Sequence, residues 1–190
     1  KLVLKIIKNN ITIFTHCHST NVVSALIYTK KKGKRFQVYI TETRPLFQGR
    51  KTAKELEKVG IKVTTFVDSA AAIALEKENK KDKIYSDIVL FGADAILKEG
   101  VINKVGSKLF SEIAKNNKIP VYVIADSWKY SPKNVKIEER DFHEVWKKVP
   151  RHIKVRNPAF EKIPEQYIKA IISELGILSY NEFLKKIRKN

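Results

Sequence analysis

Short apolar segments alternate with longer amphipathic segments along most of this chain. The apolar segments are rich in Val, Ile, Phe and Thr, which is typical of buried β-strands. We expect strands at residues 11–14, 36–41, 61–67, 88–91 and 121–125. We expect helices at residues 21–32, 51–59, 69–80 and 105–116, and two closing helices at residues 164–176 and 180–189. This alternation predicts an α/β fold, in which a parallel sheet with right-handed crossovers carries helices on both faces.

Two segments interrupt the alternation. Residues 77–86 are polar and predict a surface extension. Residues 127–156 are also polar, contain Pro132 and Pro150, and hold both tryptophans, so we expect an irregular excursion that packs against the sheet or a partner subunit. Because a chain of 190 residues can bury one good core, we expect a single domain over residues 1–190.

The formal net charge of +18 indicates that the protein attracts anions. Lysines are scattered through every segment, and no arginine-rich arm or aromatic-basic interleaving is present, so the pattern favours anionic substrates or partners over specific nucleic-acid binding. No apolar run approaches the ~18 residues of a membrane span. A single cysteine is typical of a reducing compartment, so we expect a cytoplasmic protein. The chain starts at Lys1 and lacks methionine, and we expect an N-terminal segment before it.

Residues 92–107 are the first candidate for chemistry. Asp94 follows the apolar run at residues 88–91, and open α/β sheets hold their ligands just beyond the carboxyl ends of their strands. Asn103 and Lys104 are then expected to open a helix, whose free N–H groups suit a phosphate or another oxyanion. The alternative is that Asp94 caps a turn and that Lys104 is one of many solvated lysines.

A second candidate is the segment THCHS at residues 15–19, between the first strand and the first helix. A helix N-terminus lowers the pKa of a thiol, so Cys17 is a candidate base or nucleophile. The alternatives are a metal site with His16 and His18, which the close spacing does not favour, and a buried structural cysteine.

Two more polar segments follow strands. Arg44 follows the second strand and is one of few arginines, which suits planar bidentate contacts. Asp68 follows the third strand. Because the carboxyl ends of parallel strands share one edge of the sheet, we expect all four segments to converge on one pocket.

The motifs together resemble the family of translation initiation factor 2B alpha, beta and delta subunits, and most closely its archaeal ribose 1,5-bisphosphate isomerase branch. They are THCHS (15–19), TETRPLFQGRKTAKEL (41–56), VDSAA (67–71), GADAI with GVINKVGS (92–107) and NPAFEKIPEQYI (157–168). The resemblance implies a Rossmann-like C-terminal domain and an aldose–ketose isomerase without a cofactor or metal.

The same resemblance implies roles for individual residues. Cys17 resembles the proton acceptor and Asp94 the proton donor. Further residues resemble substrate-binding positions: Ser19, Thr20, Asn103, Lys104 and Lys129. Arg44 either touches the substrate or holds its own loop through a carboxylate. The ligand is then a phosphorylated sugar or nucleotide, and ribose 1,5-bisphosphate is the expected substrate.

This sequence also departs from the isomerase pattern. We find no equivalent of the helical N-terminal domain and its Gly/Arg-rich phosphate loop, so the isolated chain is expected to be weak or inactive. Residues 77–86 are longer than the pattern, and Thr20 stands where it tends to have lysine. A non-catalytic regulatory subunit that binds initiation factor 2 therefore stays an alternative.

We also expect a homodimer or larger homo-oligomer, because the closing helices carry more apolar side chains than one sheet needs. They are Ile168, Ile171, Ile172, Leu175, Ile177 and Leu178.

Overall fold

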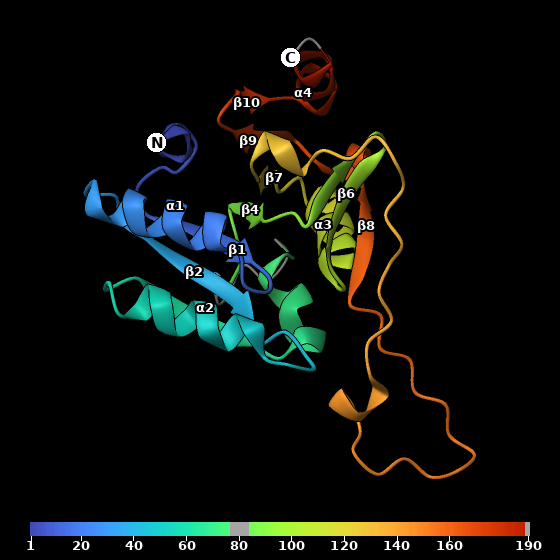
Figure 1. The fold of residues 1–190 in the computed structure, drawn as a ribbon. Helices are drawn as coiled ribbons and strands as arrows, with labels where there is room; N and C mark the ends of the chain where they lie inside the picture. Colours follow the sequence, from blue (N-terminus) through green and yellow to red (C-terminus); the bar gives the residue numbers. More distant parts are fainter. Residues whose placement is uncertain (77–83, 189–190) are drawn as a thin grey trace.

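A seven-stranded sheet forms the centre of the computed structural model, which describes residues 1–76 and 84–188 (Figure 1). Its strands are β1 (Ile11–Thr15), β2 (Phe36–Thr41), β3 (Lys62–Phe66), β4 (Ile88–Phe91), β7 (Val121–Ile124), β9 (Ala170–Ser173) and β10 (Gly176–Leu178). Their spatial order is β3-β2-β1-β4-β7-β9-β10, and all neighbours are parallel except β9 and β10. This doubly wound order confirms the predicted α/β class. Successive strands are added on one side of β1 up to β3 and on its other side from β4 onwards, so the strand order reverses between β1 and β4.

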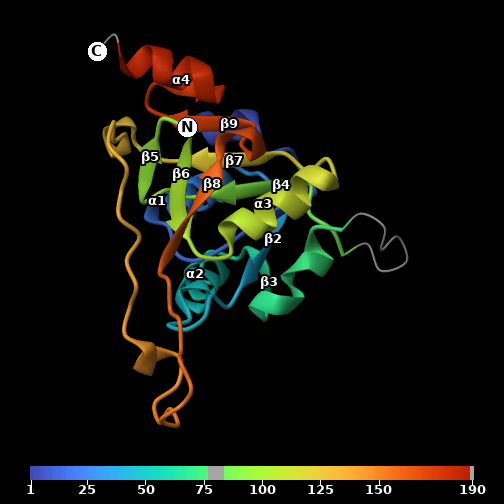
Figure 2. The same ribbon diagram turned by 90° about the vertical axis from the view of Figure 1, so that its right-hand side faces the viewer.

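Alternating side chains of the strands build one core on each face of this sheet. Ile13 and Leu90 pack in one core with α1 (Thr20–Lys31) and α2 (Gln48–Glu57). Phe14 and Phe91 point to the other core, which includes residues of α3 (Ser107–Asn116) and α4 (Tyr180–Ile187). Figures 1 and 2 show α1 and α2 on the opposite side of the sheet from α3. Each fully buried side chain of this size contributes ~1.5–3 kcal/mol, which makes the two cores the main source of stability.

A second, antiparallel sheet leaves the end of β4, and the sequence did not predict it. It consists of β5 (Ala95–Leu97), β6 (Gly100–Lys104) and β8 (Phe160–Pro164) in the order β5-β6-β8. The Tyr180 hydroxyl accepts the Gly100 N–H at 3.0 Å and donates to the Leu97 carbonyl at 2.8 Å. These bonds fix the β5–β6 turn to the start of α4.

Several predicted boundaries need correction. The closing helix expected at residues 164–176 is wrong, because this segment forms the end of β8, a 3₁₀ turn at Glu165–Tyr167, and β9. Ile171 and Ile172 are β-branched and face opposite cores from β9, as a central strand requires. The second closing helix is confirmed as α4, with a capping box between Ser179 and Glu182.

The third predicted helix is also corrected. Residues Asp68–Ala74 form a 3₁₀ helix, and Ala71 and Ala74 bury their small side chains in the core beside β2. The remainder of that prediction, and most of the polar extension at residues 77–86, lie outside the described residues. Within residues 1–76 and 84–188, no helix combines the length and apolarity that a membrane span requires.

Residues 131–159, which we call the arm, extend away from the body between β7 and β8 (Figures 1 and 2). The arm is irregular, as predicted. It begins beside the small sheet, where the N–H of Ser131 donates to the Ile96 carbonyl at 2.8 Å, and its remainder projects from the molecule (Figures 1 and 2). Several of its large apolar side chains are exposed: Val135, Ile137, Phe142, Val145, Trp146 and Ile153.

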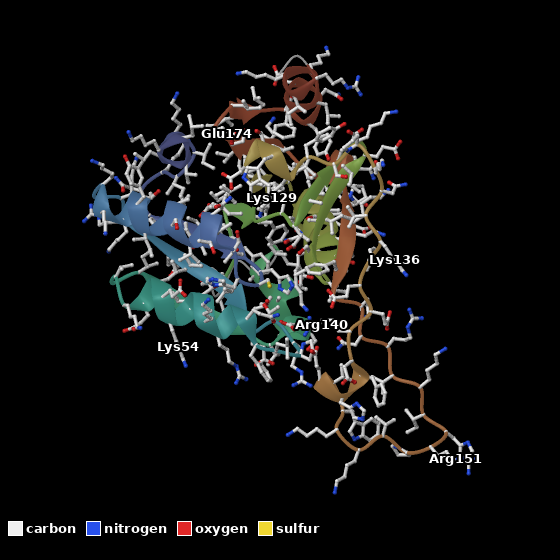
Figure 3. The ribbon with its side chains drawn as sticks, in the orientation of Figure 1. Lys54, Lys129, Lys136, Arg140, Arg151 and Glu174 are labelled. Carbon is white, nitrogen blue, oxygen red and sulfur yellow. The ribbon has the colours of Figure 1, made fainter. Side chains whose placement is uncertain are left out.

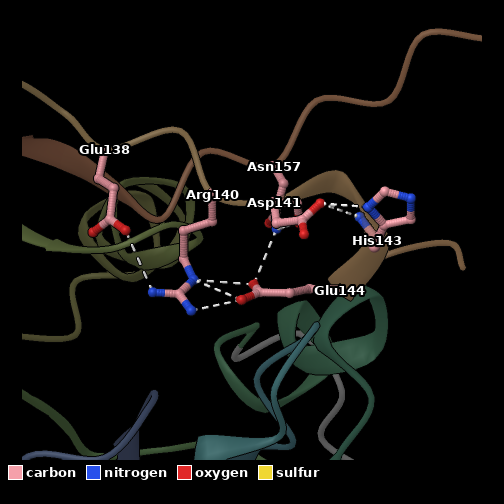
Figure 4. Close-up of polar contacts among 6 residues, drawn as sticks. All are labelled: Glu138, Arg140, Asp141, His143, Glu144 and Asn157. Carbon is pink, nitrogen blue, oxygen red and sulfur yellow. Dashed lines mark hydrogen bonds and ion pairs between the residues drawn. The ribbon is translucent and has the colours of Figure 1, made fainter.

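Ion pairs and hydrogen bonds hold the two sides of the arm together. The N–H of Arg140 donates to the Asn157 carbonyl at 2.9 Å. The Arg140 guanidinium binds both carboxylate oxygens of Glu144, and the Asn157 amide donates to Glu144 at 3.2 Å (Figure 4). Arg156 makes a bidentate contact with Glu139 at 3.0 Å through each nitrogen. The arm is therefore an ordered projection whose base is cross-linked by charged groups.

Candidate active site

The reversal of strand order between β1 and β4 places a crevice at the carboxyl ends of these strands. A cavity of about 190 Å³ lies there. Its lining consists of His18, Ser19, Thr20, Asn21, Gly92, Ala93, Asp94, Asn103 and Lys129. The structure therefore brings together Asp94 and four of the predicted substrate-binding residues, which come from the β1–α1 loop, the β4–β5 loop, β6 and the segment after β7.

Two side chains fix the β1–α1 side of this cavity. Ser19 is the N-cap of α1, and its hydroxyl accepts the N–H of Val22 at 3.4 Å. Asn21, in the first turn of α1, donates from its side chain to the Asp126 carboxylate at 3.0 Å. The latter bond ties the first turn of α1 to the segment that follows β7.

Asp94 stands at the mouth of the cavity between β4 and β5. Its N–H donates to the Ile102 carbonyl at 2.8 Å, which anchors its backbone to β6. The carboxyl group is partly exposed, yet desolvation by the surrounding protein raises its pKa, against the opposing effect of Lys129 and Lys104. Lys129 donates to the Ala93 carbonyl at 2.6 Å and so lies beside the same loop (Figure 3). A carboxyl group with a raised pKa is suited to donate a proton.

Lys104 is a buried cation of this region. It is only 4% exposed, and across the described residues no carboxylate lies within ion-pair distance of its ammonium group. Its charge lowers the pKa of both Asp94 and Cys17. An unpaired buried charge costs several kcal/mol, on the order of the desolvation penalty of one ion, so this position suits an anionic ligand.

Asn103 precedes Lys104 in β6, and this corrects the expectation that both residues open a helix. Asn103 donates to the Ser107 hydroxyl at 2.9 Å, while α3 itself begins only at Ser107. The N–H groups of Gly106 and Lys108 both donate to the carboxylate of Glu161, at 2.7 and 2.8 Å. The N-terminus of α3 thus binds a carboxylate from β8 and is not a free phosphate site.

Cys17 does not line the cavity, but the charges of Asp94 and Lys104 both act on its thiol. Burial is the largest influence and raises the pKa of the thiol, so the predicted lowering by the helix N-terminus is wrong. The physical reason is position, because Cys17 precedes the N-cap Ser19 and is largely desolvated. The N–H of His18 and the ammonium of Lys104 lower the thiol pKa in part.

Arg44 lies apart from Asp94. It lines a separate cavity of about 300 Å³ with His16, Asp68 and Arg156, and its guanidinium carbon stands 5.0 Å from the ring centre of Phe47. The carboxylate contact of this loop comes through the backbone, because Asp68 accepts the N–H of Arg44 at 2.6 Å. Arg44 is thus placed with its own loop and not with the lining of the crevice.

Comparisons with known proteins show which family this chain resembles. Residues 1–180 match the model of the Initiation factor 2 subunit family. A ribose 1,5-bisphosphate isomerase from Archaeoglobus fulgidus is 40% identical over 92% of this chain and 56% of that protein. A 5-deoxyribose 1-phosphate isomerase from Petrotoga mobilis is 37% identical over 97% of this chain and 58% of that protein.

A solved structure adds to this result. The crystal structure of translation initiation factor eIF-2B, subunit delta, from A. fulgidus matches with a TM-score of 0.85 and 31% identity, over 100% of this chain and 60% of that one. The chain spans a little more than half the length of the curated relatives described above, at 56% and 58%. The match over residues 1–180 shows that the chain belongs to the Initiation factor 2 subunit family.

Proposed function

We propose that this chain is the Rossmann-like C-terminal domain of a sugar-phosphate aldose–ketose isomerase that converts ribose 1,5-bisphosphate to ribulose 1,5-bisphosphate. One observation carries the proposal. The buried ammonium of Lys104, without a carboxylate partner among the described residues, acts on a thiol and on a carboxyl group whose pKa is raised. Such a set offers a base, an acid and an anion-binding charge at one sheet edge.

The chemistry assigns a role to each group. The C2 proton leaves while the ring oxygen takes up a proton and its bond to C1 breaks, which gives an open-chain enol. C1 then takes up a proton and the C2 hydroxyl loses its proton, so the ketose has the same composition as the aldose. Cys17 as the thiolate accepts the C2 proton, and Asp94 in its protonated form donates to the oxygen. Because burial raises the pKa of Asp94, more of it stays protonated than for an ordinary aspartic acid. Burial also makes the Cys17 thiolate scarcer but more basic.

The remaining predicted residues are proposed to bind the substrate. Lys129 supplies positive charge in the 190 Å³ cavity, and Asn103 with the backbone of Ser19 and Thr20 supplies hydrogen bonds there. Lys104 follows Asn103 in β6 and does not line this cavity, so its positive charge acts from beside it. Arg44 is proposed to shape the β2–α2 loop, since it lines a different cavity.

We further propose that the protein forms a homodimer or larger homo-oligomer, through a different surface from the one the sequence indicated. Ile168, Ile171 and Ile172 are buried in this chain's own cores and are not available for association. The exposed apolar side chains of the arm, Trp146 among them, are better placed. Light scattering of wild type and Trp146→Lys tests this: the expected change is from dimer or larger to monomer, while Lys136→Glu, a charge change on the same arm, leaves the mass unaltered.

The alternative function is a non-catalytic regulatory subunit that binds initiation factor 2. The match of this whole chain to a structure titled translation initiation factor eIF-2B, subunit delta, favours it. The deciding experiment is direct detection of the ketose product with the complete product of the gene. Turnover that requires Cys17 and Asp94 supports the isomerase, whereas binding of the bisphosphate without turnover supports the regulatory subunit.

A further inference from the structure

We propose that Thr43 and Thr52 are positioning residues that hold Cys17 in a left-handed backbone conformation and so present its thiol for proton transfer. The catalytic role of the thiol rests on the proposed function. The geometry around Cys17 is independent of that function.

The backbone of Cys17 is in an unusual conformation. Its φ is +66°, in the left-handed region that residues with a side chain rarely adopt. A residue in this region persists only where surrounding contacts hold it, and such residues concentrate at functional sites.

Two threonine hydroxyls make these contacts with Cys17. Its N–H donates to Thr43 Oγ1 at 3.0 Å, and its carbonyl accepts from Thr52 Oγ1 at 3.1 Å. Thr43 is 0% exposed and Thr52 is 1% exposed, so water does not compete for either hydroxyl. Both peptide groups next to the left-handed residue are therefore fixed, one from the β2–α2 loop and the other from α2.

The Thr43 contact continues as a chain of hydrogen bonds through the interior. The hydroxyls of Thr43 and Thr41 lie 3.0 Å apart, and Thr41 is bonded to His16 Nδ1. His16 Nε2 lies 2.8 Å from the Val105 carbonyl, which accepts only, so this nitrogen carries the proton.

The direction of each bond in this chain follows from that proton. Burial lowers the pKa of His16 to about 4, so near neutral pH the ring is uncharged and Nδ1 is an acceptor. Thr41 then donates to His16, and Thr43 donates to Thr41, whose hydroxyl and carbonyl oxygens lie 3.0 and 3.4 Å away. Thr43 is left as the acceptor that the N–H of Cys17 requires. The chain ends at Val105, directly after Lys104, so the position of Cys17 is tied to β6.

The Thr52 contact is determined in the same way. A hydroxyl has one proton, and Thr52 gives it to the Cys17 carbonyl. His18 Nδ1, 2.9 Å away, therefore donates to Thr52. The backbone of Thr43 is itself held in place by Asp68, which accepts the N–H of Thr43 at 2.8 Å.

The held conformation has a chemical consequence for the thiol. The N–H of His18 bonds to the sulfur and, with Lys104, favours the thiolate, whereas burial, Asp94 and Asp68 disfavour it. If Cys17 left the left-handed region for the common α or β region, ψ would change together with φ. Because ψ sets the direction of the His18 N–H relative to the Cys17 side chain, the bond to the sulfur would be altered. Loss of one hydrogen bond to a charged group corresponds to roughly a tenfold change in thiolate population.

The test uses the fact that Cys17 is the only cysteine of the chain. The rate of alkylation by iodoacetamide, measured across pH, then reports on this thiol alone. Thr43→Val keeps the shape but removes the hydroxyl, and Thr43→Ser keeps the hydroxyl. Thr64→Val, at an exposed position of β3, is the matched control.

We expect Thr43→Val to lower alkylation at neutral pH about tenfold and to raise the apparent thiol pKa, with Thr43→Ser and Thr64→Val near wild type. Thr52→Val removes the second contact and provides the same test if Thr43→Val does not fold. In the complete gene product, kcat should fall with little change in KM. A folded Thr43→Val or Thr52→Val protein with a wild-type alkylation profile overturns the inference. An altered profile in a protein without turnover upholds it and refutes the proposed function alone.

Discussion

Gly92 approaches Ser19 so closely that a Cβ atom on Gly92 would lie 2.4 Å from the Ser19 hydroxyl oxygen. Gly92 directly follows β4 and Ser19 caps α1, so this contact joins the two loops that diverge at the crevice. Glycine is required here for close approach, and not for a left-handed turn.

Gly92→Ala is expected to destabilise the protein by ~1–3 kcal/mol, because the added methyl group must displace Ser19. Ser19→Gly alone removes the side chain of an N-cap and should cost only a few tenths of a kcal/mol. The double variant should recover most of the loss, which thermal or urea unfolding of all four proteins measures. If the losses of stability in the two single variants add up in the double variant, the contact between Gly92 and Ser19 does not cause the loss in Gly92→Ala.

Cys17→Ser and Asp94→Asn are each expected to lower kcat by ~10²–10⁴-fold while leaving substrate binding largely intact. Serine is too weak a base near neutral pH, and asparagine has no acidic proton to give, yet both keep the size of the original side chain. Detection of the ketose product in the complete gene product is the measurement. Near-normal turnover in either variant would exclude that residue from the proton transfers.

Lys104→Met should strengthen the fold while weakening ligand binding. The substitution removes a buried charge without an ion-pair partner among the described residues, and such replacements stabilise by ~1 kcal/mol or more. Affinity for ribose 1,5-bisphosphate should fall ~10–100-fold, as for loss of a charge-assisted hydrogen bond. Unfolding curves and calorimetric titration measure the two effects, with Lys162→Met on exposed β8 as the control. A variant that loses stability and keeps affinity would contradict the anion-binding role.

The pH dependence of kcat/KM follows from the two raised pKa values. The active form needs the Cys17 thiolate and protonated Asp94. Below the pKa of Asp94, which is raised above 3.8, the acid is already protonated and the thiolate still diminishes, so the rate falls with falling pH. Above the thiol pKa, raised beyond 9.0, the thiolate is complete and the protonated acid still diminishes, so the rate falls again. A plateau should lie between; a steady rise up to the thiol pKa would mean that Asp94 acts in its ionised form.

The base of the arm should separate in acid. The contacts with Arg156 and the N–H of Asn157 lower the pKa of Glu139 from 4.5 to about 2. Because the folded-state pKa is depressed, this contact is fully present above 4.5 and is lost as the pH falls towards about 2. Fluorescence of Trp146 in a Trp128→Phe background should report the transition. Arg156→Gln should move the midpoint of this transition closer to pH 4.5. A midpoint that does not move would show that groups other than Glu139 cause the transition.

The sequence predicted those parts of the fold that depend on local pattern. The apolar runs around Phe14 and Phe91 identified central strands, and Asp94, which follows one of them, lines the cavity at the predicted edge of the sheet. The segment around Ile171 fits the spacing of a helix as well as that of a strand, because its apolar residues are Ile168, Ile171, Ile172 and Leu175. Only pairing with β7 decides between the two, and that contact is not local.

The supporting residues of the site were beyond such reasoning. Thr43, Thr52 and Glu161 lie in the quoted motifs, but nothing in their spacing shows that they contact Cys17 or the N-terminus of α3. The pKa of the Cys17 thiol is raised by burial, whereas the sequence predicted that it would be lowered. The pattern of residues shows that Cys17 is near a helix end, but it does not show desolvation.

The pairing of β6 with β8 sets an order in which the protein can assemble. Gly100 lies opposite Pro164 and Lys104 opposite Phe160, so these contacts close a long loop that contains β7 and the arm. Long-range closures of this kind are slow relative to local structure. The strand that carries Asn103 and Lys104 therefore gains its outer neighbour late, after most of the chain has been synthesised. A nascent chain that ends before β8 has its Cys17 and Asp94 segments but lacks the outer neighbour of β6, the strand that carries Asn103 and Lys104.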